Sequence, residues 1–251
     1  TEKYKILITS YGDGELPIID GNDKVGDAVV SLKNCNNITI SNLEIFDSST
    51  TEADRRGVLI LGNNPNNNSK IITYSNITLD GLYIHDINGI TDKENSGMSA
   101  ESKKTGGIHF GSLDGKAKFD NLIIKNCKIK NVSNVGIASW YKFGSTSNKV
   151  SPYSDKFKDT AYTNILIENN DISYIGKNAI FVRNLLGGYV KNNVVYETAI
   201  KCISGNSIVT SYVDGTVIEY NEGYYNRASA KSDGKIQDGW MLDADLQSKN
   251  T

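Results

Sequence analysis

Two aspartates near the end of the chain have the residue types and the spacing that acid–base chemistry requires. Asp243 and Asp245 lie in the segment Asp238-Gly239-Trp240-Met241-Leu242-Asp243-Ala244-Asp245. On a β-strand, residues two positions apart share one face, and their Cα atoms lie roughly 6.6 Å apart. Paired carboxyl groups near this separation act as the acid and as the base or nucleophile of glycoside hydrolysis. We therefore expect Asp243 to be a key carboxylate, with Asp245 as its partner.

The same segment could instead bind a metal ion. Carboxylate oxygens are ligands that Ca²⁺ prefers, so Asp238, Asp243 and Asp245 form a possible calcium set, completed by a loop carbonyl. Glycoside hydrolysis by two carboxylates requires no cofactor, and calcium stays an alternative use of these residues.

A rival mechanism depends on two cations that precede the aspartates. Elimination from a uronate needs a cation that neutralises the sugar carboxylate and a base that removes the neighbouring proton. Arg183 could be that cation, and Lys201, with its pKa lowered by Arg183, could be that base. This pair indicates a polysaccharide lyase as the alternative to a hydrolase.

Aromatic and polar residues that could hold a sugar occur at related positions of the chain. Trp140 and Phe181 offer flat apolar faces for pyranose rings, and His109 is a further candidate for binding. Tyr141 opens the aromatic-rich segment from Tyr141 to Thr163. Arg56, in Asp54-Arg55-Arg56, is expected either to bind an acidic sugar or to form an ion pair at a corner of the fold.

A repeated pattern of short apolar segments must position these residues. Its first half starts at six places, and its second half alternates strictly with the first. The first halves begin at Ile40, Leu79, Ile124, Ile167, Val190 and Ile218, and the second halves at Gly57, Gly107, Gly136, Ala179, Ala199 and Gly239. Short runs rich in Ile and Val, bounded by Gly, Asn, Asp and Ser, are typical of strands. The pattern predicts an all-β fold, a single-stranded right-handed parallel β-helix of about six to seven coils, with long loops on one side.

Alternation within the second-half strands predicts which side chains face outward. Stacked coils repeat at roughly 4.8 Å, so equivalent residues of successive coils become neighbours. The outer strip is expected to carry His109, Trp140, Phe181, Arg183, Lys201, Met241 and Asp243. The long insertions are expected at Gly62 to Ser75, Gly111 to Asp120, Tyr141 to Thr163 and Gly205 to Gly215. One corner column, Asn170, Asn193 and Asn221, is expected to form an internal ladder of hydrogen bonds.

Composition excludes several classes of protein. The chain has 27 Lys and Arg against 29 Asp and Glu, a formal net charge of −2, which argues against a chain-wide basic surface for nucleic acid. Its three cysteines have no spacing typical of a disulfide framework or a zinc site. No apolar run approaches the roughly 20 residues that span a bilayer, so we expect no membrane partner.

The whole chain resembles the secreted bacterial right-handed parallel β-helix proteins of the pectate-lyase-like superfamily. Segments that carry this resemblance include Ile8 to Gly12, Pro17 to Gly21, Asp54 to Val58, Gly136 to Trp140 and Asp238 to Asp245. Trp240-Met241-Leu242-Asp243 is similar to the Trp-Leu-Asp-Trp segment of β-helical β-xylosidases, where the Asp is the nucleophile. The resemblance implies a bacterial protein that is secreted or displayed at the cell surface. The patterns of polygalacturonases and pectate lyases are absent from the sequence.

Three functions follow from these observations. The first is a carbohydrate-active enzyme that hydrolyses glycosidic bonds in a polysaccharide or oligosaccharide, with Asp243 central. The second is a polysaccharide lyase that uses Lys201 and Arg183, and the third is a non-catalytic glycan-binding or structural β-helix. Residues 1–251 are expected to form one β-helix domain, a fragment without its C-terminal coils and cap, which would permit end-to-end self-association.

Overall fold

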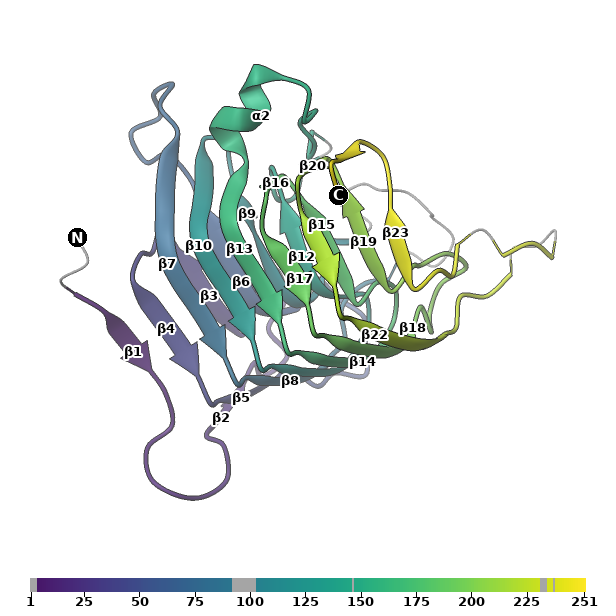
Figure 1. Cartoon of the computed structure of the whole chain (residues 1–251). Coiled ribbons are helices and arrows are strands. Elements are labelled where there is room, and N and C mark those ends of the chain that lie inside the picture. The colour runs from purple at the N-terminus through teal and green to yellow at the C-terminus, as the bar shows by residue number, and fades with distance from the viewer. Residues whose placement is uncertain (1–3, 92–102, 146, 231–233, 237) are drawn as a thin grey trace.

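The protein is a parallel β-helix in which three strands and three turns make each coil (Figure 1). The computed structural model describes residues 4–91, 103–145, 147–230, 234–236 and 238–251. Strands of successive coils pair in parallel and form three sheets, called sheets A, B and C here. The predicted fold class is thus confirmed.

The strands of each sheet follow one another in chain order. Sheet A contains β1 (Ile6–Ile8), β4 (Ile38–Ser41), β7 (Ile72–Asp80), β10 (Ala117–Lys125), β13 (Tyr162–Glu168), β16 (Leu185–Leu186), β17 (Tyr189–Lys191), β20 (Val213–Asp214), β21 (Val217–Glu219) and β24 (Ser248–Lys249). Sheet B contains β2 (Ile18–Asp20), β5 (Glu44–Phe46), β8 (Tyr83–Ile87), β11 (Lys128–Val132), β14 (Asp171–Ile175), β18 (Val194–Thr198) and β22 (Glu222–Asn226). Sheet C contains β3 (Val30–Lys33), β6 (Arg56–Gly62), β9 (Gly106–Ser112), β12 (Val135–Trp140), β15 (Ile180–Arg183), β19 (Ile208–Ser211) and β23 (Leu242–Ala244).

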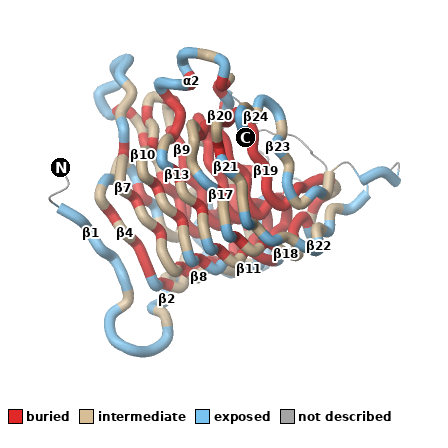
Figure 2. Tube along the Cα trace, in the orientation of Figure 1, coloured by how far each residue is buried: buried red, intermediate tan, exposed pale blue. Residues whose placement is uncertain are grey.

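Buried residues recur along the strands of successive coils (Figure 2). The core lies inside the coils and consists of rows of stacked aliphatic side chains. In sheet B, one row aligns Ile45, Ile84, Ile129, Ile172 and Val195, and all five are fully buried. Burying such side chains stabilises the fold by about 1.5–3 kcal/mol each, so the stack contributes strongly to stability. At the first coil the inward residues Ile6 and Ile8 are 54% and 45% exposed.

Asparagine shapes the corner between sheets A and B. Asn42, Asn126, Asn169 and Asn192 adopt the left-handed conformation, with φ of 52°, 54°, 54° and 55°, and Gly81 takes their place in one coil with φ 64°. Asn and Gly tolerate this conformation at low cost, so the sharp turn recurs in coil after coil.

The next residue of that corner forms the expected ladder. Asn170 Nδ2 donates to Asn193 Oδ1 at 2.9 Å, and Asn193 Nδ2 donates to Asn221 Oδ1 at 2.9 Å. Asn193 Nδ2 also donates to the backbone oxygen of Ile167 at 3.0 Å, and Asn221 Nδ2 donates to that of Val190 at 2.8 Å. The ladder therefore ties consecutive coils together inside the fold.

One predicted strand is wrong. Ala199–Cys202 is a turn, and the strand of that coil is β19, which pairs with β15 and β23. Ala199 has φ 59°, and the amides of Ile200 and Lys201 donate to backbone oxygens at the end of sheet B, so this segment cannot extend into sheet C. The insertion expected at Gly205 to Gly215 is wrong for the same reason, because it contains β19 and β20.

Insertions occur at both edges of sheet C. Those at 63–71, 113–116 and 141–161 leave sheet C toward sheet A, as predicted, and the last carries helix α2 (Asp155–Thr160). Connections 88–105, 199–207 and 227–241 instead enter sheet C from sheet B. No helix in the described part of the chain is long and apolar enough to span a membrane.

Candidate active site

The outward row of sheet C has the predicted register. Leu59 aligns with His109, His109 with Ala138, and Ala138 with Phe181. Phe181 aligns with Val209, and Val209 aligns with Asp243 on β23. The sequence thus placed His109, Phe181 and Asp243 correctly on one row.

Most of this surface is covered, so the predicted open strip is wrong for its middle coils. Trp140 and His109 are fully buried, and the Trp140 indole N–H donates to His109 Nδ1 at 3.2 Å. Phe143, from the 141–161 connection, packs edge-on against the His109 ring. Burial lowers the pKa of His109 to about 3, helped by the charge of Arg56. Trp140 and His109 therefore pack within the protein and present no face to solvent.

Arg183 is buried beneath the same connection. Its guanidinium donates to Ser211 Oγ at 2.9 Å and to Asn148 Oδ1 at 2.7 Å, and it lies over the rings of Phe181 and Tyr212. Burial lowers its pKa to about 10. Enclosed in this way, Arg183 cannot receive a sugar carboxylate from solvent as the lyase prediction required.

Tyr141 and Arg56 also have structural surroundings. Tyr141 is 7% exposed and packs in a small cluster with Val150 and Phe157. Arg56 is 2% exposed, pairs with Asp54 and donates to the backbone oxygen of Asp27 at 3.1 Å. The ion pair at a corner, one of the two predicted alternatives for Arg56, is the one observed.

Lys201 lies at another edge of the molecule, contrary to its predicted place on the strip. Its ammonium group donates to Ser133 Oγ at 2.9 Å and lies 3.5 Å from Glu52 Oε1. It lines a cavity of about 210 Å³ together with Asp86 and Asn88. Lys201 and Arg183 are therefore separated, because the turn at Ala199–Cys202 replaces the strand that would have aligned them.

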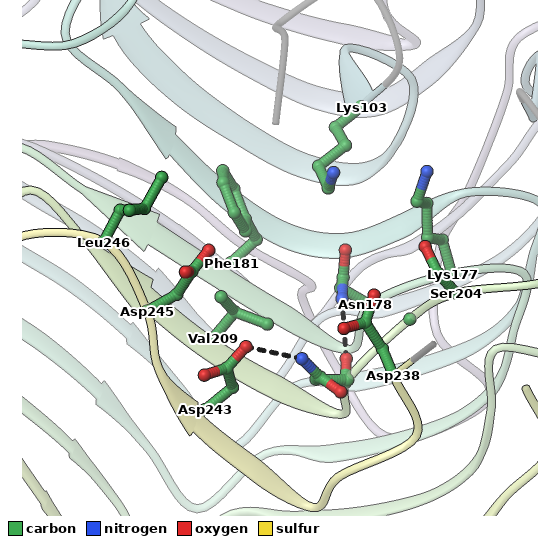
Figure 3. A pocket seen from close by; sticks show the side chains of 12 residues that line it. Lys103, Lys177, Asn178, Phe181, Ser204, Val209, Asp238, Asp243, Asp245 and Leu246 are labelled. Atoms are coloured by element: carbon green, nitrogen blue, oxygen red, sulfur yellow. Dashed lines mark hydrogen bonds between the residues drawn. The ribbon is translucent and has the colours of Figure 1, made fainter. Parts of the chain in front are cut away.

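A cavity of about 340 Å³ lies where the connections from sheet B reach the end of the outward row (Figure 3). It is lined by Lys103, Lys177, Asn178, Phe181, Ser204, Gly205, Asn206, Val209, Asp238, Asp243, Asp245 and Leu246. The structure thus brings together Asp238, Asp243 and Asp245. Figure 3 shows the three carboxyl groups on one side of the cavity and the ammonium groups of Lys103 and Lys177 on the other.

Asn206 holds the acidic segment in place. Its side-chain N–H donates to Asp243 Oδ2 at 2.6 Å. Its side-chain oxygen accepts the backbone amides of Gly239 and Trp240, both at 2.9 Å. One side chain therefore fixes the start of the segment, just after Asp238, relative to β23, which carries Asp243.

The environment of Asp243 favours its protonated form. Burial raises the pKa of this carboxyl, and the nearby charges of Asp245 and Asp238 raise it further, while the hydrogen bond from Asn206 acts in the opposite direction. A carboxyl group with a raised pKa in a cavity suits proton donation. Asp243 can therefore supply a proton, with Asp245 or Asp238 as the second carboxylate.

The sequence reasoning missed Lys103, Lys177, Asn178 and Asn206. Burial holds the pKa of Lys103 well below its ordinary value, and the charges of Lys177 and Arg183 add to the effect. Asn178 and Asn206 each lie two residues before an inward Ile of sheet C, so equal spacing before β15 and β19 is a signal that could have revealed them. Lys103 follows an insertion, where the repeat gives no information.

The predicted calcium set is not assembled. Among the described residues, no three His, Cys, Asp or Glu side chains are close enough together to hold a metal ion. Asp238, Asp243 and Asp245 share a cavity without forming a compact ligand group.

Similar proteins were found by sequence and by structure. No protein-family model matches the chain. A lacto-N-biosidase of Bifidobacterium longum subsp. longum is 26% identical over 281 residues, covering 87% of this chain and 15% of the relative. The native structure of a GH136 lacto-N-biosidase from Eubacterium ramulus has a TM-score of 0.69 and 22% identity, covering 92% of this chain and 48% of the enzyme. Its selenomethionine form gives a TM-score of 0.67 at 20% identity.

The chain covers only part of the length of these similar proteins. The chain spans about half the length of the solved enzyme and 15% of the Bifidobacterium relative. At 22% identity the structural match supports the parallel β-helix fold. Variants of the three aspartates that line the cavity can test whether this chain has the chemistry of those enzymes.

Proposed function

We propose that this protein is a glycoside hydrolase that acts on an oligosaccharide. The observation that carries the proposal is the convergence of Asp238, Asp243 and Asp245 on one cavity of about 340 Å³. That volume lies in the range of about 300–1,000 Å³ typical of small-molecule sites. The likeness to lacto-N-biosidases over 87% of the chain supports a glycosidic substrate.

The chemistry needs two carboxyl groups with different protonation states. One carboxylic acid protonates the leaving oxygen, and a carboxylate attacks the sugar or activates water. Asp243 is suited to the acid because its pKa is raised. Asp245 follows the end of β23 and lines the same cavity, and Asp238 reaches it from the preceding connection, so either carboxylate is placed to be the second group.

The lyase alternative has no comparable support. It required Arg183 and Lys201 in one site, and the structure separates them. We infer that the protein works outside the cell or at its surface, as its resemblance to secreted β-helix proteins implies. Lacto-N-biosides are the first substrates to test, since two of the similar proteins are lacto-N-biosidases.

The proposal is tested with a panel of oligosaccharides and 4-nitrophenyl glycosides that includes a lacto-N-bioside. Wild-type protein should release reducing sugar without forming the ultraviolet-absorbing unsaturated uronate of a lyase. Asp243→Asn and one of Asp238→Asn or Asp245→Asn should each lower kcat/KM by about 10³-fold or more. Added azide should restore the hydrolysis rate of an activated 4-nitrophenyl glycoside only in the variant that has lost the nucleophile or base, which identifies that residue.

A matched control is Glu168→Gln on sheet A, where Glu168 pairs with Lys191 at the surface. This variant should retain full activity. No turnover of any panel member, or turnover that survives all three Asp→Asn changes, would contradict the hydrolase proposal. Sugar binding without turnover would then favour a glycan-binding protein.

A further inference from the structure

Asn178 lines the candidate site with a fixed side-chain orientation. It is 3% exposed, and its Nδ2 donates to the backbone oxygen of Asn206 at 2.6 Å. Only the NH₂ end of the amide can donate to a carbonyl, so this contact determines which end faces Asn206. The oxygen end must point the other way, and Figure 3 shows it directed into the cavity.

The Asn178 oxygen lacks a hydrogen-bond donor among the described residues. A buried acceptor left unsatisfied costs about 1–3 kcal/mol, so such groups are uncommon without a purpose. The backbone of Asn178 is fixed as well, because its carbonyl oxygen accepts a hydrogen bond from the amide of Gly136 at 3.0 Å. The side chain therefore cannot rotate away without breaking its bond to Asn206.

The surroundings of this oxygen select the kind of group that can bind it. Lys103 and Lys177 line the same cavity with amino groups that can donate hydrogen bonds, and the aspartates line its other side. A substituent that only accepts hydrogen bonds would be repelled by the Asn178 oxygen. A group that donates one hydrogen bond and also offers an acceptor satisfies both Asn178 and a neighbouring lysine, and sugar hydroxyl and N–H groups have this character.

We propose that Asn178 is a specificity-determining residue, whose side-chain oxygen accepts a hydrogen bond from a hydroxyl or N–H substituent of the bound sugar. The inference rests on the proposed function for the identity of the ligand. It also connects recognition to the acidic segment, since Asn178 binds Asn206 and Asn206 binds Asp243. A sugar that engages Asn178 is thereby held in fixed relation to the Asp243 carboxyl.

The test compares sugars that have and lack each donor. The panel glycosides that bind, and their monodeoxy and N-deleted analogues, are titrated by calorimetry into the Asp243→Asn protein, where turnover is expected to be blocked. One analogue should bind about tenfold more weakly or worse than its parent. In the Asn178→Ala, Asp243→Asn double variant the same analogue and its parent should bind equally, which identifies the substituent and separates a hydroxyl from an N–H.

Two further variants separate recognition from folding. Asn193→Ala changes an equally buried amide far from the cavity, and it should leave the discrimination between the parent and the analogue unchanged. Asn178→Asp keeps an oxygen acceptor at this position, so discrimination between the parent and the analogue should return. If Asn178→Ala does not fold, this variant and the parent protein carry the comparison.

The outcomes distinguish the two proposals. Equal discrimination with and without Asn178 would overturn the role of this residue, while hydrolysis by the wild-type protein would leave the proposed function standing. If the wild-type protein shows no turnover but sugar binding depends on Asn178, the sugar site would be supported and the hydrolase proposal contradicted. Binding of no panel member would contradict both.

Discussion

At the scale of single residues, the site depends on polar side chains that hold each other in place. Asn206 contacts the Asp243 carboxylate and two backbone amides of the acidic segment, and Asn178 contacts Asn206. Their positions are set by β15 and β19, which are part of the rigid stack. Side chains fixed in this way can hold reacting groups in productive geometry without reorganisation during the reaction.

The raised pKa of Asp243 predicts a pH-dependent cost in stability. Since the native state binds its proton more tightly than the unfolded chain, this contribution to stability falls as pH rises above about 3.9 and through the folded pKa. Asp243→Asn keeps an acceptor for Asn206 and removes the charge. We expect the variant to have a larger free energy of unfolding than wild type at pH 7.

Urea unfolding at pH 7 and at pH 3 measures this difference, which should vanish at the lower pH. Asp159→Asn, an exposed change in α2, serves as the control. Its free energy of unfolding should equal that of wild type at pH 7 and also at pH 3. A variant less stable than wild type at pH 7 would contradict the direction of the shift.

Residue-level prediction succeeded where the repeat determines position. The alternation placed Asp243, Phe181 and His109 on one row because strand residues alternate faces. It could not predict that Trp140 and Arg183 are covered, since Phe143 and Asn148 come from a connection outside the repeat. Long-range packing of an insertion leaves no periodic signal in the sequence.

At the scale of elements, the asparagine ladder is a polar structure inside an apolar stack. Asn193 accepts two hydrogen bonds from Asn170 and donates to Asn221 and to the Ile167 backbone oxygen. Asn193→Ala leaves several of these buried groups unpaired. We expect a loss of about 3 kcal/mol in free energy of unfolding by urea. Asn192→Gly, at the adjacent left-handed position, should change it by less than about 1 kcal/mol.

The connection over Trp140 also has a testable role. Phe157 in α2 is fully buried with Tyr141 and Val150, and it anchors the 141–161 connection. In a Trp240→Phe background the remaining emission comes from Trp140, which is fully buried. Phe157→Ala should loosen the connection and increase acrylamide quenching of Trp140 about twofold or more, because the cover carries Phe143 and Asn148.

The matched control for this change is Tyr153→Ala, which alters a 71% exposed ring of the same connection. Its quenching should equal that of the background protein. Unchanged quenching in Phe157→Ala would show that Trp140 is protected by other elements.

The one misplaced element shows how a repeat can be misread. Ala199-Ile200-Lys201-Cys202 has the same alternation as a strand of sheet C, but its amides bond to the end of sheet B. The true strand, β19, begins at Ile208, nine residues after Ala199. Pattern alone cannot choose between two apolar segments in one coil, because the choice depends on which one reaches the partner strands.

At the scale of the whole molecule, the described strands of each coil pair only with strands of the adjacent coils. Stability in such a solenoid is approximately a sum over adjacent coils, so terminal coils have fewer stabilising contacts. Ile6 and Ile8 illustrate this, since they are 54% and 45% exposed, whereas Ile38 and Ile40 of the next coil are 6% and 2% exposed.

Hydrogen exchange should therefore vary along the axis. Amides of β11 and β14 in central coils should exchange slowest, and those of β2 and β23 should exchange at least about tenfold faster. Exchange followed by mass spectrometry of peptides measures the gradient. Uniform protection along all coils would indicate a single cooperative unit instead of nearest-neighbour behaviour.

Strand β23 and the connections that enter sheet C differ in how freely their lengths can change during evolution. The position of Asp243 on β23 is set by strand pairing, where losing one residue would turn every following side chain to the opposite face. The connections that bring Lys103, Asn206 and Asp238 to the same cavity are free of that constraint, and their lengths can drift without disturbing the stack. Under the proposed function, changes in sugar preference should therefore arise from lengthening or shortening these connections, while Asp243 on β23 keeps its place.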